Sequence, residues 1–140
     1  NRQGFEALDS LDSEAKRYIA PLPVAYDPEL PGYKSMLDMM EGGGNHANDN
    51  LPKAQAVKDA TMAYFIAQNS GKGRTFIHFH GTYHSDNFEG IVWYLKNLNP
   101  DLKVLTISSC EQDTVDKLDE ENEKKADFIL VIPTSMTKTN

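Results

Sequence analysis

Three of the four histidines in this 140-residue chain fall within seven residues, at His78, His80 and His84. His78 and His80 end a β-branched and aromatic segment, residues 74–80. Side chains two positions apart on a strand point to the same face, with Cα atoms about 6.5–7 Å apart. The following loop, residues 81–87, allows His84 to fold back toward the same place. Neutral imidazole is a common ligand of Zn, Mn and Fe, so these three histidines are candidate metal ligands.

Each side chain in this region also has an ordinary structural reading. A histidine on a strand can be a hydrogen-bonded core residue, which applies to His78 and His80. Tyr83 is either a packing aromatic or a phenolate ligand to ferric iron. Met39 belongs to the methionine-rich segment 36–40, which can fill a core or contact a flat apolar ligand.

The residue patterns that several other kinds of catalysis require are absent from the sequence, and we assign no catalytic residue. The sequence contains neither Gly-x-Ser-x-Gly nor Gly-x-x-x-x-Gly-Lys-Ser/Thr. The single cysteine, Cys110, cannot form an intrachain disulfide and has no histidine beside it in sequence. A net charge of −7 argues against a nucleic-acid partner. No run of 18 apolar residues predicts a membrane span.

The elements that must position these residues follow from the apolar periodicity. Strands are predicted where β-branched and apolar residues cluster, over residues 74–80, 103–109 and 127–132. Strands that alternate with helices predict an α/β fold, with a parallel sheet of at least three strands and flanking helices. Ligands of such sheets bind beyond the carboxyl ends of the strands, which places residues 81–87 at the binding edge.

The remaining segments divide into helices and connectors. Residues 21–33 carry four prolines and form a predicted extended connector. Residues 42–50, with three glycines and His46, form a predicted loop. Helices are predicted over residues 13–20, 34–41, 51–69, 88–97 and 112–124.

The sequence resembles a known group of proteins. Gly81-Thr82-Tyr83-His84 matches the Gly-x-x-His motif of the Tiki/ChaN/erythromycin-esterase group. The string 76–91 and three further segments, residues 18–23, 54–63 and 126–138, resemble the ChaN branch. The resemblance extends over nearly the whole chain. It implies that residues 1–140 are the C-terminal portion of one larger ChaN-like α/β domain, because the first motif of the family has no counterpart here.

The resemblance implies haem binding in bacterial iron uptake, by a periplasmic or surface lipoprotein of the cell envelope. His84 is the motif histidine, and Tyr83, His80 and Met39 complete the expected haem-binding set. The Tiki and esterase branches imply an alternative, a metal-dependent hydrolase or protease that uses Mn or Zn. A half-domain with no activity of its own is a third reading.

The expected partners follow from the same argument. Besides haem, we expect a homodimer or association with the missing N-terminal half, because a narrow parallel sheet leaves an unpaired strand edge. No nucleic acid is expected to bind. Membrane contact would come only through a lipid anchor outside this chain.

Overall fold

The computed structural model describes residues 4–41 and 50–138. Residues 42–49 of the predicted glycine-rich loop, including His46, lie outside this part of the chain. The elements follow in the order α1 (Glu6–Asp9), the 3-10 helix η1 (Ala15–Tyr18), α2 (Pro31–Glu41), α3 (Asn50–Asn69), the 3-10 helices η2 (Thr82–His84) and η3 (Asp86–Phe88), α4 (Ile91–Leu98), β1 (Ile107–Gln112), the 3-10 helix η4 (Glu120–Asn122) and β2 (Phe128–Pro133).

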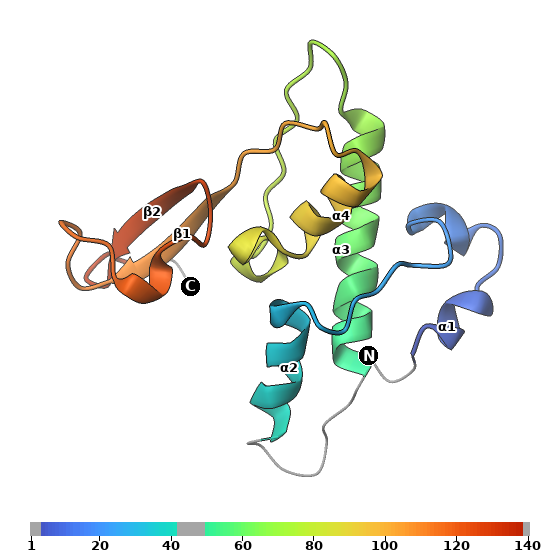
Figure 1. The fold of residues 1–140 in the computed structure, drawn as a ribbon, viewed down its shortest axis with the longest axis horizontal. Coiled ribbons are helices and arrows are strands. Elements are labelled where there is room, and N and C mark those ends of the chain that lie inside the picture. Colours follow the sequence, from blue (N-terminus) through green and yellow to red (C-terminus); the bar gives the residue numbers. More distant parts are fainter. Residues whose placement is uncertain (1–3, 42–49, 139–140) are drawn as a thin grey trace.

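The long helix α3 packs against both α2 and α4 (Figure 1). Pro52 lies in its first turn, where the missing N–H breaks no helical hydrogen bond. Alanines at helical spacing let the neighbouring helices approach closely. One buried cluster joins Ala60 and Ala63 to Ile91, Tyr94 and Leu95 of α4, and the other joins Ala56 to Tyr33 and Met36 of α2.

Helix α4 begins later than the periodicity predicted. The prediction was residues 88–97, and the helix spans Ile91–Leu98. Asn87, Phe88 and Gly90 all have positive φ angles, of 58°, 63° and 50°, which right-handed helix does not allow. The chain therefore turns tightly between His84 and α4 before the apolar face of α4 begins.

The strands β1 and β2 form a parallel pair, with a register that runs from Ile107 opposite Phe128 to Gln112 opposite Pro133. Just before the strands, the Asp127 carboxylate accepts hydrogen bonds from the Thr106 backbone N–H at 2.7 Å and from its hydroxyl at 3.0 Å. Figure 1 shows this sheet to one side of the helices.

The sheet therefore has two strands in the described part of the chain, and the third predicted strand is not formed. Residues 74–80 form no backbone pairing with another strand in the described part of the chain, and they are exposed. Their β-branched and aromatic composition favours a strand, but a strand exists only through hydrogen bonds to a neighbour. The structure supports mixed α and β character with a parallel sheet, and corrects the expectation of three strands.

Two predicted helices are also replaced by shorter turns. Residues 13–20 contain only η1. The predicted helix 112–124 is an irregular segment that contains η4. The buried Gln112 side chain closes this segment, because its amide donates to the carbonyls of Thr114 at 2.5 Å and Lys117 at 2.7 Å.

The two faces of the sheet differ in how far their side chains are exposed. On one face, Ile107, Phe128 and Leu130 are between 58% and 68% exposed, and Leu105, two residues before β1, is 62% exposed; we call these four residues the apolar sheet face. On the opposite face, the polar side chains of Ser108 and Gln112 are buried, and the apolar side chains of Ile129 and Val131 are partly buried. There the Ser108 hydroxyl donates to Asp86 at 2.7 Å, which attaches the sheet to η3.

No helix in the described residues is both long enough and apolar enough to cross a bilayer.

Candidate functional site

The 3-10 helix η2 places the His84 ring against Asp59 of α3. The Nδ1 atom of His84 lies 2.5 Å from Oδ1 of Asp59. Asp59 is completely buried, whereas 22% of the His84 side chain remains exposed. The pair thus joins a carboxylate of the core to an imidazole that solvent or a ligand can reach.

Tyr33 of α2 holds the other oxygen of the same carboxylate. Its hydroxyl donates to Oδ2 of Asp59 at 2.8 Å. Burial raises the pKa of the Asp59 carboxyl, while the hydrogen bonds from His84 and Tyr33 act in the opposite direction. Burial, followed by the negative charge of Asp59, raises the pKa of the Tyr33 hydroxyl. Tyr33 therefore remains a neutral donor at physiological pH.

Gln55, one turn before Asp59 on α3, also contacts the His84 ring. Its amide nitrogen lies 2.7 Å from Nδ1 and 3.4 Å from Nε2. Two side chains of one helix therefore approach the same edge of the imidazole.

Gly90 allows the loop to pass close to this pair. It has a φ of +50°, and a Cβ built there would collide with the backbone carbonyl of His84. The same Cβ would lie 3.2 Å from Oδ2 of Asp59. A glycine is thus required both by the backbone angle and by the space beside Asp59.

The other two candidate histidines continue outward from His84. The ring centroids of His80 and His84 are 6.2 Å apart, and those of His78 and His80 are 5.2 Å apart. Partial burial of the ring, together with the charges of the two neighbouring imidazoles, lowers the pKa of His78. Within the described residues, no group of three or more His, Cys, Asp or Glu side chains is placed to hold a metal ion. The three rings are neighbours, and their role as metal ligands stays a prediction.

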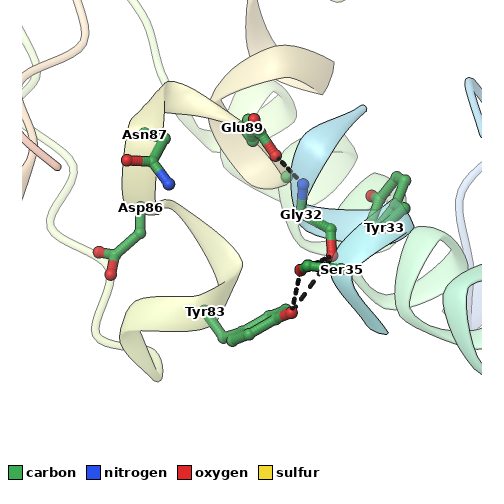
Figure 2. A pocket seen from close by; sticks show the side chains of 8 residues that line it. Gly32, Tyr33, Ser35, Tyr83, Asp86, Asn87 and Glu89 are labelled. Atoms are coloured by element: carbon green, nitrogen blue, oxygen red, sulfur yellow. Dashed lines mark hydrogen bonds between the residues drawn. The ribbon is translucent and has the colours of Figure 1, made fainter. Parts of the chain in front are cut away.

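Tyr83 lines a pocket of about 130 Å³ between η2, η3 and the start of α2 (Figure 2). Its hydroxyl donates to the Gly32 carbonyl at 3.2 Å and lies 2.9 Å from the Ser35 hydroxyl. Across the pocket, the Glu89 carboxylate accepts a hydrogen bond from the Gly32 N–H at 2.6 Å. The expected set is therefore divided: His80 and His84 lie together, and Tyr83 faces α2.

Met39 lies on α2, and its side chain is outside the part of the structure that is described. Its predicted contact with a ligand stays a prediction.

The residues present fit a haem in their chemistry but do not enclose one. Imidazole and phenol are established iron ligands, and Phe76, Ile77 and Phe79 expose apolar surface next to the histidines in sequence. Ligand pockets usually measure about 300–1,000 Å³, so the pocket beside Tyr83 is too small for a porphyrin. The exposed surface that the described residues offer beside the histidines is that of residues 76–83.

Asp59 and Tyr33, the residues that support His84, were not predicted from the sequence. Asp59 occupies a buried stripe of α3 at helical spacing, with Ala56, Ala60 and Ala63. An acidic residue inside such an apolar stripe was the available signal, because carboxylates are almost never buried without a partner. Tyr33 gave no comparable signal.

A family model described as "Haem-binding uptake, Tiki superfamily, ChaN" matches residues 1–95. The matched part contains α2, α3 and the loop that carries Tyr83 and His84. Neither the curated proteins nor the solved structures give a match.

Proposed function

This chain belongs to the ChaN family of haem-binding uptake proteins in the Tiki superfamily, and we propose on that basis that it binds haem for bacterial iron or haem uptake. His84 is the proposed iron ligand. Haem supplies the iron and a flat apolar ring, and the chain supplies the ligand and the apolar surface that holds it. The match of the family model supports the cofactor class, and the geometry of His84 supports the choice of ligand.

One observation carries this choice. The Nδ1 atom of His84 faces the buried carboxylate of Asp59 at 2.5 Å. Histidines that bind metals almost always donate their second ring N–H to a carboxylate, a carbonyl or water. In that arrangement Nε2 would be the nitrogen left to hold the iron, and 22% of the His84 side chain is exposed.

The other predicted residues take secondary roles in the proposal. His80, whose ring is 6.2 Å from that of His84, is a second imidazole for the same ligand. Tyr83 would have to leave its bonds to Gly32 and Ser35 in order to reach iron. Met39 is proposed as an apolar contact from α2.

The location of the protein in the cell and the cover of its haem surface are also part of the proposal. We propose that the complete protein is a lipoprotein of the bacterial cell envelope, because the ChaN family takes part in uptake. We also propose that the haem surface is covered by a second copy or by further sequence of the same protein. Residues 76–79 are exposed and the pocket beside Tyr83 is small. Both observations support a haem surface that another part of the protein or a second copy covers.

Hemin titration of the chain, followed by the Soret band, tests the proposal. His84→Ala should weaken binding by more than the ~10–100-fold that loss of a supporting residue costs. Tyr83→Phe tests the phenolate reading, with Tyr18→Phe as its matched control, because Tyr18 is an exposed tyrosine on η1. Unchanged spectra and affinities in His84→Ala and Tyr83→Phe would remove both residues from the haem site.

The Asp59–His84 pair also favours a second candidate, a metal-dependent hydrolase of the Tiki or erythromycin-esterase type. A histidine oriented by a carboxylate can act as a general base on water or on a nucleophile. Peptide and ester cleavage in the presence of Mn or Zn, lost in His84→Ala, would support this alternative. Hemin binding without such cleavage would reject it.

A further inference from the structure

Asp59 is buried in a place where an ionised group is costly. It lies in the middle of α3 with no exposed surface. Such a carboxylate is retained only when hydrogen bonds compensate its lost hydration. Both of its oxygens have partners, His84 at 2.5 Å and Tyr33 at 2.8 Å. The carboxylate therefore joins α2, α3 and η2 at a single point.

Two groups of α3 compete for the same nitrogen of His84. An ionised Asp59 can only accept a hydrogen from Nδ1, whereas the Gln55 amide nitrogen, 2.7 Å away, can only donate one to it. A neutral imidazole has either an N–H or a lone pair at Nδ1, so it cannot satisfy both. Asp59 favours the tautomer with hydrogen on Nδ1, and Gln55 favours the tautomer with hydrogen on Nε2.

The contacts around Asp59 favour the His84 tautomer with hydrogen on Nδ1 over the tautomer with hydrogen on Nε2. A hydrogen bond to an ionised acceptor is about twice as strong as one between neutral groups. The Asp59 contact is also the shorter of the two, at 2.5 Å against 2.7 Å. Tyr33 stabilises the carboxylate from its other side. Gln55 can instead turn its amide so that the oxygen faces the ring.

We propose that Asp59, held by Tyr33, is a positioning residue for His84 that keeps the ring hydrogen on Nδ1 and leaves the Nε2 lone pair for a ligand. The inference rests on the proposed function, in which that ligand is the iron of haem. Asp59 is completely buried, so it would not contact haem itself. Helix α3 thereby sets both the orientation of the imidazole and the nitrogen it offers.

The tautomer can be measured without haem. Long-range ¹H–¹⁵N NMR at about pH 8.5, where ordinary imidazoles are neutral, distinguishes the protonated ring nitrogen from the other. The spectrum of His84→Gln assigns the signals. We expect hydrogen on Nδ1 of His84 in the wild type and in the matched control Gln55→Ala. In Asp59→Asn the hydrogen should move to Nε2, because the Tyr33 hydroxyl, which donates to Oδ2 of Asp59, would bind the asparagine oxygen and so direct the amide N–H toward Nδ1.

Two NMR results would overturn the inference. One is a wild-type His84 with hydrogen on Nε2. The other is a folded Asp59→Asn chain whose tautomer is unchanged.

Hemin affinity gives the second measurement. Asp59→Asn should weaken hemin binding about 10–100-fold, as for other residues that support a metal ligand. Tyr33→Phe removes only one hydroxyl and should weaken binding by less, in the same direction. If the Asp59→Asn chain does not fold, the Tyr33→Phe variant is used to test the inference. An unchanged tautomer population and an unchanged hemin affinity in Tyr33→Phe would then reject the role of the Tyr33–Asp59 pair.

These measurements separate this inference from the proposed function. A chain with the Nδ1–H tautomer that binds no hemin refutes haem binding and supports the role of Asp59 in positioning the ring. A chain that binds hemin with the Nε2–H tautomer refutes the role of Asp59 alone.

Discussion

At the scale of single residues, the site depends on positions where only one side chain fits. Gly90 is the clearest case, because its φ of +50° and the nearby His84 carbonyl both exclude a Cβ. It stands between the loop that carries His84 and the helix α4. The loop conformation that brings His84 to Asp59 therefore depends on this glycine.

Gly90→Ala should lower the free energy of unfolding by about 1–3 kcal/mol, the cost of one residue held in a strained backbone region. It should also disturb the contact between His84 and Asp59. Urea unfolding measures the first effect and the His84 NMR signals measure the second. Gly71→Ala is the matched control, since nothing lies within 4 Å of a Cβ built there. Equal losses in both variants would contradict the role given to Gly90.

Tyr94 gives a prediction about alkaline pH. Its buried hydroxyl donates to the Ala25 carbonyl at 2.6 Å, and burial raises the pKa of Tyr94 to about 12. The ordinary tyrosine pKa is about 10, so the unfolded chain loses this proton first. The stabilising contribution is complete below pH ~10 and is lost as pH rises through ~12.

Tyr94→Phe should therefore cost about 1 kcal/mol near pH 8, where the hydrogen bond to Ala25 is lost. Between pH ~10 and ~12 the stability of the variant should fall less steeply than that of the wild type. Urea unfolding at several pH values measures both curves. Parallel curves would show that Tyr94 does not titrate with a raised pKa.

The Asp59 site combines a histidine that the sequence predicts with partners that it does not. The motif and the loop position identified His84 as the central residue, and the structure gives it a buried partner. The partners themselves are separated in sequence: Asp59 lies 25 residues from His84 and 26 from Tyr33. Local periodicity carries no information about such pairs, because packing between helices decides which side chains meet.

At the scale of elements, hydrogen bonds between Asp127 and Thr106 hold the two strands together at their start. The Asp127 carboxylate bonds Thr106 immediately before both strands, and the Thr106 hydroxyl accepts from the Asp127 N–H at 3.0 Å. These bonds fix the register in which Ile107 meets Phe128.

Asp127→Ala should destabilise β1 and β2 by about 1–2 kcal/mol, through the loss of two hydrogen bonds at an exposed carboxylate. Amide hydrogen exchange should increase in both strands while α3 remains protected. Asp116→Ala, at an exposed aspartate elsewhere, is the control and should leave exchange unchanged. Faster exchange in α3 as well would mean that the sheet and the helices unfold together.

The elements show where local patterns suffice. Helix α3 was predicted over residues 51–69 and spans Asn50–Asn69, because its length and its lack of interior glycine determine it locally. The strand predicted over residues 103–109 begins later, at Ile107, since pairing with β2 sets its ends. Residues 74–80 have the composition of a strand but no partner in the described chain. Pairing is a property of two segments and cannot be read from one.

At the scale of the whole molecule, the apolar sheet face is an exposed surface in the described part of the chain. Ile107 and Phe128 are register partners, so their side chains are neighbours on this face. They are 68% and 59% exposed. Contiguous exposed apolar surface on a sheet usually marks an interaction site. We propose that a second copy of the chain covers it.

The chain should therefore associate at increasing concentration, with a sedimentation coefficient that rises toward that of a dimer. Phe128→Lys and Leu130→Lys should shift the equilibrium to monomer, because they place charge on the apolar sheet face. Val115→Lys is the control, since Val115 is 53% exposed outside this face. A wild-type chain that sediments as a monomer at all concentrations would contradict the proposal.

The attachment of the sheet to the helices has a thermodynamic consequence. The sheet segment holds η3 by two bonds, from Ser108 to Asp86 at 2.7 Å and from the Asn87 N–H to the Lys125 carbonyl at 2.8 Å. Asp86 is two residues beyond His84, so a partner on the sheet and a ligand at His84 act on the same short stretch of backbone. If a partner binds the sheet and a ligand binds His84, we expect their affinities to be coupled, and such coupling is reciprocal: the factor by which the partner changes the ligand's affinity equals the factor by which the ligand changes the partner's affinity.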